Sequence, residues 1–194
     1  MAYEAVETSP AASAQGRRGG ALLIGLVLAG ALVAITLGVY ARLHPPARRE
    51  TVQLLFSATL PFKVWITTLV LALAVFQVAS AMRLYGRIGS GHAPEWLGQV
   101  HRLSGTLAFI ASLPVAFHCL WSIGFTPASS PRALVHTALG CLFYGAIVVK
   151  VGAVRSHQLP GWTLPVVGGI VFTALTGLWV TSSLWFFMTV GLQL

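Results

Sequence analysis

The chain has no aspartate and only four glutamates among its 194 residues. The glutamates, Glu4, Glu7, Glu50 and Glu95, lie outside the long apolar runs or at the edge of one. Proton and cation pathways through membranes usually employ chains of Asp and Glu, so the sequence argues against a carboxylate-driven pump or antiporter. A di-iron site is excluded, because it needs inward-facing glutamates.

Charge of either sign is scarce, and other catalytic signatures are missing as well. Only 8% of the residues are charged and 56% are hydrophobic, with a mean hydropathy of +0.81. A soluble domain carries about 25% charged residues, so the composition indicates a membrane protein. Neither an HExxH motif nor a serine with a base and an orienting group is present, which leaves hydrolytic chemistry unsupported. The two cysteines, Cys119 and Cys141, lie in apolar runs without CxxC spacing and are predicted to be buried thiols.

Five apolar runs are long enough to cross a bilayer, which takes roughly 20 helical residues. The first is too long for the apolar core of a signal peptide, so we expect a retained helix. Residues 1–20 are small, polar and aperiodic, and we predict a disordered tail there. The fold class predicted for residues 21–194 is all-α, a single bundle of five transmembrane helices at about 21–43, 60–85, 96–123, 132–155 and 162–190.

The basic residues lie mostly between the apolar runs and give a net charge of +8. That distribution is typical of membrane surfaces, and no basic cluster with interleaved aromatics points to nucleic acid. The count on each side of the bilayer favours a cytoplasmic N-terminus, in a protein that we expect in a bacterial plasma membrane. The side of the tail has Arg17, Arg18, Arg83, Arg87, Arg102, Lys150 and Arg155, and the other side has Arg42, Arg48, Arg49, Lys63 and Arg132.

Six histidines are present, and four of them belong to the third and fourth runs or their ends. His44 and His92 fall in loops, where we expect solvated side chains. His118 lies near the end of the third run and His136 near the start of the fourth, each about one helical turn inside the same membrane face. Imidazoles from facing helices are the axial ligands that haem iron uses. We therefore predict haem ligation by His118 and His136, with interhelical hydrogen bonding as the alternative.

Other residues near these histidines suit the periphery of a haem. His101 and His157 share the opposite side of the membrane and are candidates for a second haem, although their depths match less well. Haem propionates need basic partners, and Arg132, Lys63 and Arg102 are candidates, unless they are interfacial anchors. Gly105 and Gly140 each follow a histidine by four residues, which leaves room for a flat macrocycle or for close helix packing.

The segment from His101-Arg102-Leu103-Ser104-Gly105 through His118, and that from His136 through Lys150, resemble the histidine-bearing helices of ferric-reductase-like and related membrane b-type cytochromes. The chain is also similar to a family of uncharacterised small actinobacterial membrane proteins. The cytochrome resemblance covers roughly residues 60–190 and implies His101, His118, His136 and His157 as ligands of two stacked haems. The spacing within each helix is longer here than in those cytochromes. No flavin or nicotinamide domain is present, so a complete reductase would need a partner.

The sequence thus predicts a membrane haem b electron-transfer protein, with iron bound by His118 and His136. One haem b is expected, with a second near His101 left open. We expect its partners to be the lipid bilayer and a quinol or a redox protein. If it belongs to an enzyme, it is at most the membrane cytochrome b subunit of an oxidoreductase. The alternative is a non-catalytic accessory or assembly subunit of a membrane complex. A transporter with histidine gates is a weaker alternative, because the five runs show no internal repeat.

Overall fold

The computed structural model describes residues 10–45, 47, 58–123 and 130–192. All of the regular structure in these ranges is helical, as predicted, and five helices are long and apolar enough to cross a membrane. The elements are α1 (Pro10–Leu43), α2 (Thr59–Leu84), α3 (Glu95–Phe117), η1 (His118–Ile123), α4 (Pro131–Val154), α5 (Thr163–Trp179), η2 (Val180–Leu184) and α6 (Trp185–Thr189).

The spans begin and end close to the predicted residues, except at the start of α1. This helix begins at Pro10 instead of near residue 21, so the part of the predicted tail from residue 10 onward is helical. The alanines at 11, 12 and 14 have the highest helix propensity of any residue, which explains the extension. The tail prediction for residues 1–9 lies outside the described residues.

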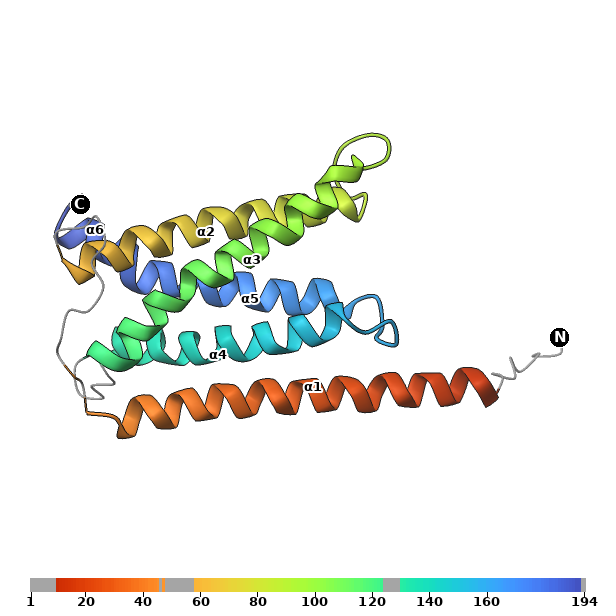
Figure 1. Cartoon of the computed structure of the whole chain (residues 1–194), viewed down its shortest axis with the longest axis horizontal. Helices are drawn as coiled ribbons and strands as arrows, with labels where there is room; N and C mark the ends of the chain where they lie inside the picture. The colour runs from red at the N-terminus through yellow and green to blue at the C-terminus, as the bar shows by residue number, and fades with distance from the viewer. Residues whose placement is uncertain (1–9, 46, 48–57, 124–129, 193–194) are drawn as a thin grey trace, which may run out of the picture.

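The helices lie side by side in an antiparallel bundle (Figure 1), in which α4 packs on both α1 and α5, and α2 packs on both α3 and α5. The α2–α3 and α4–α5 connections lie at the end of the bundle where α1 begins, which we call the tail end. The opposite end holds the start of α2, segment η1, the start of α4 and segment η2 with α6. We call it the distal end.

Glycines at one crossing bring α1 and α4 into backbone contact. A Cβ atom added to Gly30 would lie 2.6 Å from the carbonyl oxygen of Gly145, and the reverse substitution meets the same obstacle at Gly30. Ala34 and Gly38, which lie on the same side of α1, face Gly145 and Cys141. Small residues therefore replace side-chain interdigitation here, as they often do between helices in membranes.

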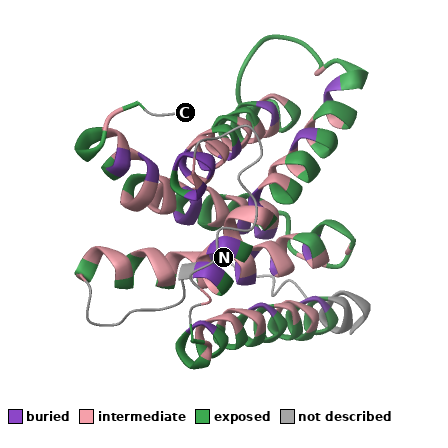
Figure 2. Cartoon of the chain, turned by 60° about the vertical axis from the view of Figure 1, so that its left-hand side comes forward, coloured by how far each residue is buried: buried purple, intermediate pink, exposed green. Residues whose placement is uncertain are grey.

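Many large apolar side chains are exposed on the outside of the bundle. The buried residues lie on the helix faces that turn inward (Figure 2). Ile24, Leu28, Leu32 and Ile35 of α1 are each more than 60% exposed, which suits contact with lipid. The tightest core lies midway along the bundle, where Val70, Phe143, Ala174 and Leu175 join α2, α4 and α5. This core separates the distal end from the tail end.

Two of the membrane-crossing helices change to π-helix as they approach the distal end. Segment η1 follows Pro114, which lacks the N–H that a regular helix would use. Within η2 the hydroxyls of Thr181 and Ser182 donate to the carbonyls of Gly177 and Leu178, 2.7 and 2.6 Å away. The Ser183 hydroxyl also donates to Val64 O of α2 at 3.0 Å, which fixes η2 against that helix. π-Helical turns are rare and frequently occur at functional sites.

Candidate functional site

A cavity of about 340 Å³ lies at the distal end, between the two π-helical segments. Its volume falls within the range of about 300–1,000 Å³ that is typical of small-molecule and cofactor pockets. Residues of α1, α2, α3, α4, α5 and α6 complete the wall. The polar lining side chains are Lys63, Thr67, Ser112, Cys119, Arg132, His136, Thr137, Cys141, Tyr144, Thr181 and Ser182.

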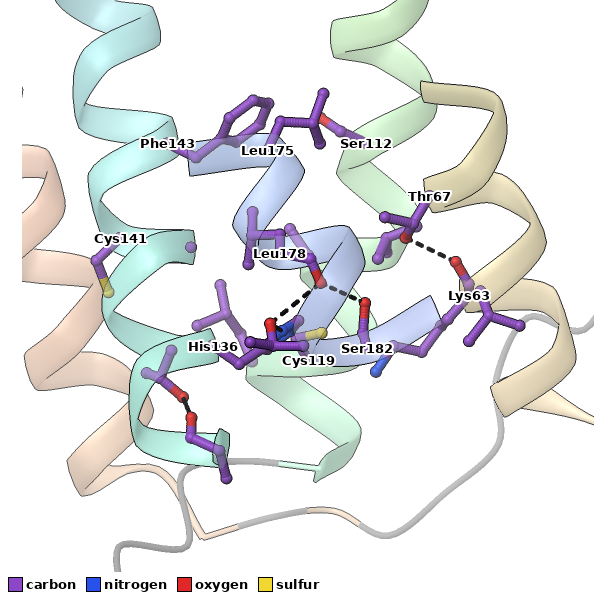
Figure 3. Close-up of a pocket in the computed structure, with 18 of the residues that line it drawn as sticks. Lys63, Thr67, Ser112, Cys119, His136, Cys141, Phe143, Leu175, Leu178 and Ser182 are labelled. Atoms are coloured by element: carbon purple, nitrogen blue, oxygen red, sulfur yellow. Dashed lines mark hydrogen bonds between the residues drawn. The ribbon is translucent and has the colours of Figure 1, made fainter. Parts of the chain in front are cut away.

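The cavity has its charged side chains at one end and is less polar at the other. Figure 3 shows His136, Cys119 and Ser182 toward the distal end of the bundle, and Phe143 and Leu175 at the deeper end, where Ser112 also lies. Tyr144 bridges α4 to α3 there by donating its hydroxyl proton to Ser112, with both oxygens of Ser112 3.0 Å away. The cavity therefore suits an amphipathic ligand whose polar end lies near the membrane surface.

His136 projects from the second turn of α4 into the polar end, and its tautomer follows from its neighbour. Its Nδ1 lies 2.9 Å from Thr181 Oγ1, and that hydroxyl already donates its proton to Gly177 O at 2.7 Å. Thr181 must therefore accept from His136, so Nδ1 has the proton and Nε2 keeps its lone pair. Histidines that ligate a metal usually donate the N–H of their other ring nitrogen to a neighbouring group, as Nδ1 of His136 does here.

Two cations line the same end of the cavity. Arg132, one helical turn before His136, donates to the carbonyl of Thr181, and its guanidinium lies 3.9 Å from the centre of the Trp185 ring. Lys63 comes from the second turn of α2 and also lines the wall. Two of the three predicted partners of an anionic group, Arg132 and Lys63, thus line the same cavity as His136, and Arg132 is also anchored to η2.

The sequence predicts Cys119 only as a buried thiol, whereas the structure places it in the cavity wall among polar side chains. Both cysteines are unpaired, as expected. Cys119 lines the distal cavity together with His136 and Lys63 (Figure 3). No local motif in the sequence signals this cluster, because its members come from three separate helices.

His118 is placed differently from His136, although it belongs to the adjacent helix end. It is fully buried, and its Nδ1 lies 3.2 Å from Ser122 Oγ one turn further along η1. Its ring packs edge-on against Phe62 and Phe117, with centroids 6.0 and 5.6 Å away. His118 does not belong to the cavity wall, whereas its neighbour Cys119 does. The structure brings the predicted pair to the same end of the bundle but does not aim both rings into one space.

His101 lies at the tail end and faces α2. Its Nδ1 is 2.7 Å from Ser80 Oγ, and the Ser80 hydroxyl donates to Phe76 O at 2.7 Å. Gln77 of α2 donates to the carbonyl of His101 and to Ser104 Oγ, and its side chain occupies the space beside Gly105. Close packing therefore explains Gly105, whereas Gly140, the other predicted glycine, lines the cavity.

The remaining predicted residues are not brought together with His101. His157 is exposed in the bend between α4 and α5, and Arg102 is exposed on α3. His92 is an exposed loop residue, as expected. The prediction for His44 is wrong, because its ring stacks on Tyr40 and Trp121 with centroids 5.0 and 4.7 Å away instead of being solvated.

The described residues contain no group of three or more His, Cys, Asp or Glu side chains that would hold a metal ion by themselves. A porphyrin brings four nitrogen ligands of its own and needs only axial imidazoles, so this finding does not bear on haem.

Comparison with known proteins identifies a family but no activity. No curated protein and no solved structure matches the chain. The sequence profile of one family, described as a family of unknown function (DUF6529), matches residues 23–194, which include the whole of the cavity. The chain therefore belongs to this family, DUF6529.

Proposed function

We propose that the protein is a membrane electron-transfer protein that binds haem b in the distal cavity. The observation that supports this most is the polar end of the cavity, which is lined by His136, whose Nε2 keeps its lone pair, and by the cations Lys63 and Arg132. The cytochrome resemblance of the helices that bear His101, His118 and His136 is consistent with it. The plasma membrane of a bacterium, with the N-terminus in the cytoplasm, is the proposed location.

The cavity's donor set suits a haem with one imidazole in place. His136 would face the iron, with Thr181 fixing the ring, and Lys63 and Arg132 would pair with the two propionates. Val70, Phe143 and Leu175 would exclude water from the macrocycle. Haem iron supplies reversible one-electron transfer, and the protein's own part is to bind, orient and keep the site dry.

The second imidazole is the part of the proposal that requires a rearrangement. His118 would have to leave its packing against Phe62 and Phe117 to reach the cavity that Cys119 already lines. Its place in a π-helical segment offers a route to such a change of phase, because the hydrogen bonds of a π-helix span one residue more than those of an α-helix. A second haem ligated by His101 has less support, because His101 does not line the distal cavity and its Nδ1 lies against Ser80 instead.

A visible spectrum of the purified protein, recorded before and after dithionite reduction, tests the proposal. We expect a haem b difference spectrum that disappears in His136→Ala. If His118 ligates as well, His118→Ala shifts the spectrum to that of a five-coordinate haem or abolishes it. A colourless wild-type protein, purified from cells supplied with a haem precursor, would refute the proposal.

The second candidate is an accessory or assembly subunit of a membrane complex. The two interhelical hydrogen bonds, His136 to Thr181 and His101 to Ser80, favour it, because they give both histidines a purely structural use. This candidate predicts colourless protein that co-purifies with a larger complex, so the same spectrum separates the two.

A further inference from the structure

The distal cavity is lined by two cations, and the described residues place no carboxylate beside them. Arg132 and Lys63 both belong to the wall, and the Arg132 guanidinium contacts two neutral groups, the Thr181 carbonyl and the Trp185 ring. Among the described residues, the membrane-spanning helices contain one carboxylate, that of Glu95, which lies at the tail end in the first turn of α3. Cationic groups inside a membrane protein are costly unless they are paired, so the cavity favours an anionic occupant.

The hydroxyl groups of the cavity wall already donate their protons to the protein. All six donate to main-chain or side-chain oxygens that lie 2.6 to 3.0 Å away, and they belong to Thr67, Ser112, Thr137, Tyr144, Thr181 and Ser182. A ligand with hydrogen-bond acceptors far from the two cations would leave those acceptors unpaired, which costs free energy. The wall therefore favours a ligand whose polar atoms are confined to its anionic group.

The cavity extends from the distal end toward the middle of the bundle. Lys63 and Arg132 belong to the first two turns of α2 and α4, which begin at the distal end. The apolar side chains of Val70, Phe143 and Leu175 line the cavity and also form the core midway along the bundle. A lipid of the distal leaflet covers the same depth, with its headgroup at the surface and its alkyl chain directed toward the bilayer midplane. Such a lipid matches the cavity in both polarity and direction.

We propose that the haem-free cavity binds a single-chain lipid with an anionic headgroup, either the carboxylate of a long-chain fatty acid or the phosphate of a lysophospholipid. The headgroup oxygens accept hydrogen bonds from the Arg132 guanidinium and the Lys63 ammonium. The alkyl chain packs against Val70, Phe143 and Leu175. The volume of about 340 Å³ is near the lower limit for ligand pockets, which favours one alkyl chain over two.

This inference goes beyond electron transfer and does not rest on it. The lipid headgroup uses the same two cations as the haem propionates, so the lipid and haem are alternative occupants of the cavity. Only haem needs the imidazole of His136, because its iron takes a nitrogen ligand whereas the headgroup is paired by Lys63 and Arg132. His136→Ala should therefore abolish haem binding and leave lipid binding unchanged, so the two proposals can fail separately.

The experiment measures equilibrium binding to the full-length, haem-free protein, freed of bound lipid and kept in a non-ionic detergent. Two radiolabelled probes are used, palmitate and 1-palmitoyl-lysophosphatidylglycerol, and unlabelled methyl palmitate is the uncharged competitor. We expect saturable binding of one lipid per polypeptide, which methyl palmitate does not displace. Binding of palmitate alone identifies a carboxylate site, and binding of the lysophospholipid alone identifies a phosphate site. Either result, or binding of both probes, supports the proposal.

Matched variants test whether the cations and the cavity bind the lipid. Lys63→Gln and Arg132→Gln should each weaken binding about tenfold, because each change removes a hydrogen bond to a charged group. Gly140→Leu should also weaken binding, because its side chain fills part of the cavity. Arg155→Gln is the control, since Arg155 is exposed at the end of α4 and should not affect binding.

Size-exclusion chromatography confirms that each variant is folded. Arg132 also holds η2, so if Arg132→Gln does not fold, Lys63→Gln and Gly140→Leu decide the outcome. The proposal would be overturned by the absence of saturable binding of both probes or by equal competition from methyl palmitate. An unchanged affinity in folded Lys63→Gln and Gly140→Leu would overturn it as well.

Discussion

The two ends of the bundle use histidine in the same way but surround it differently. At each end a histidine lies against the hydroxyl of a neighbouring helix, Thr181 for His136 and Ser80 for His101, and that hydroxyl donates onward to a carbonyl of its own helix. At the distal end the imidazole opens onto a cavity with two cations, whereas at the tail end Gln77 fills the adjacent space. The two ends therefore differ in the free space beside the imidazole and not in the contact that each imidazole makes.

The largest effect expected from this comparison comes from removing each imidazole in turn. His136→Ala should abolish binding of haemin to protein reconstituted in nanodiscs, because the cavity then has no nitrogen ligand facing it. His101→Ala is the matched control and should bind like the wild type. Titration followed by the Soret absorbance measures both, and equal loss in the two variants would remove the distinction between the ends.

A second prediction concerns Gly140→Leu, a substitution that fills part of the cavity and changes no polar group. A Cβ atom on Gly140 would lie 3.8 Å from Leu178 Cδ2, so the backbone tolerates a side chain, but the larger Gly140→Leu would occupy the space that we assign to the ligand. We expect at least tenfold weaker haemin binding with little change in thermal stability.

The matched change at the tail end is Gly105→Ala. Its Cβ would lie 2.9 Å from the Gln77 side chain, and such overpacking costs about 1–3 kcal/mol. We expect a lower unfolding temperature and unchanged haemin binding. Reversal of the two outcomes would mean that the functional end has been misassigned.

Removing the hydroxyl that each histidine contacts should have a smaller effect on haemin binding. Thr181→Val keeps the shape of the side chain but removes the acceptor for His136, and loss of such an outer partner usually weakens metal binding about 10- to 100-fold. Ser80→Ala should leave haemin binding unchanged, because His101 does not line the distal cavity. Comparable weakening by both changes, in the same titration, would show that the hydroxyls act through the stability of the bundle.

The smallest predicted effect concerns the cations. Lys63→Gln should weaken binding of haemin only severalfold, since Arg132 remains beside the propionates, and should reduce the preference for haemin over its dimethyl ester. The control is Lys150→Gln, because Lys150 is a half-buried residue of α4 that does not line the cavity. An equal loss for haemin and its ester in Lys63→Gln would exclude the proposed pairing with propionates.

Much of the fold follows from the sequence, because the bilayer sets the length of each apolar run. The runs predicted at 60–85 and 132–155 correspond to Thr59–Leu84 and Pro131–Val154. The placement of His118 and His136 at the same end of the bundle follows equally from their positions near helix ends. The helical start of α1 at Pro10 does not follow from the sequence pattern, because residues 10–20 are mostly small and polar. The high helix propensity of their alanines is the weaker signal.

The candidate site was less accessible to prediction, for two physical reasons. The partner of His136 is 45 residues away in η2, and no local pattern links a histidine to such a hydroxyl. The direction of His118 depends on the π-helical turn that begins at this residue, which changes the helical phase in a way that regular periodicity does not reveal. Cys119 was overlooked for the related reason that its neighbours are all on other helices.

The number of haems per polypeptide tests the account most directly. It is measured by the pyridine haemochrome method on wild-type, His136→Ala and His101→Ala proteins purified from cells supplied with a haem precursor. The account predicts close to one haem in the wild type and in His101→Ala, and almost none in His136→Ala. A wild-type protein without haem, or the same haem content in all three, would contradict it.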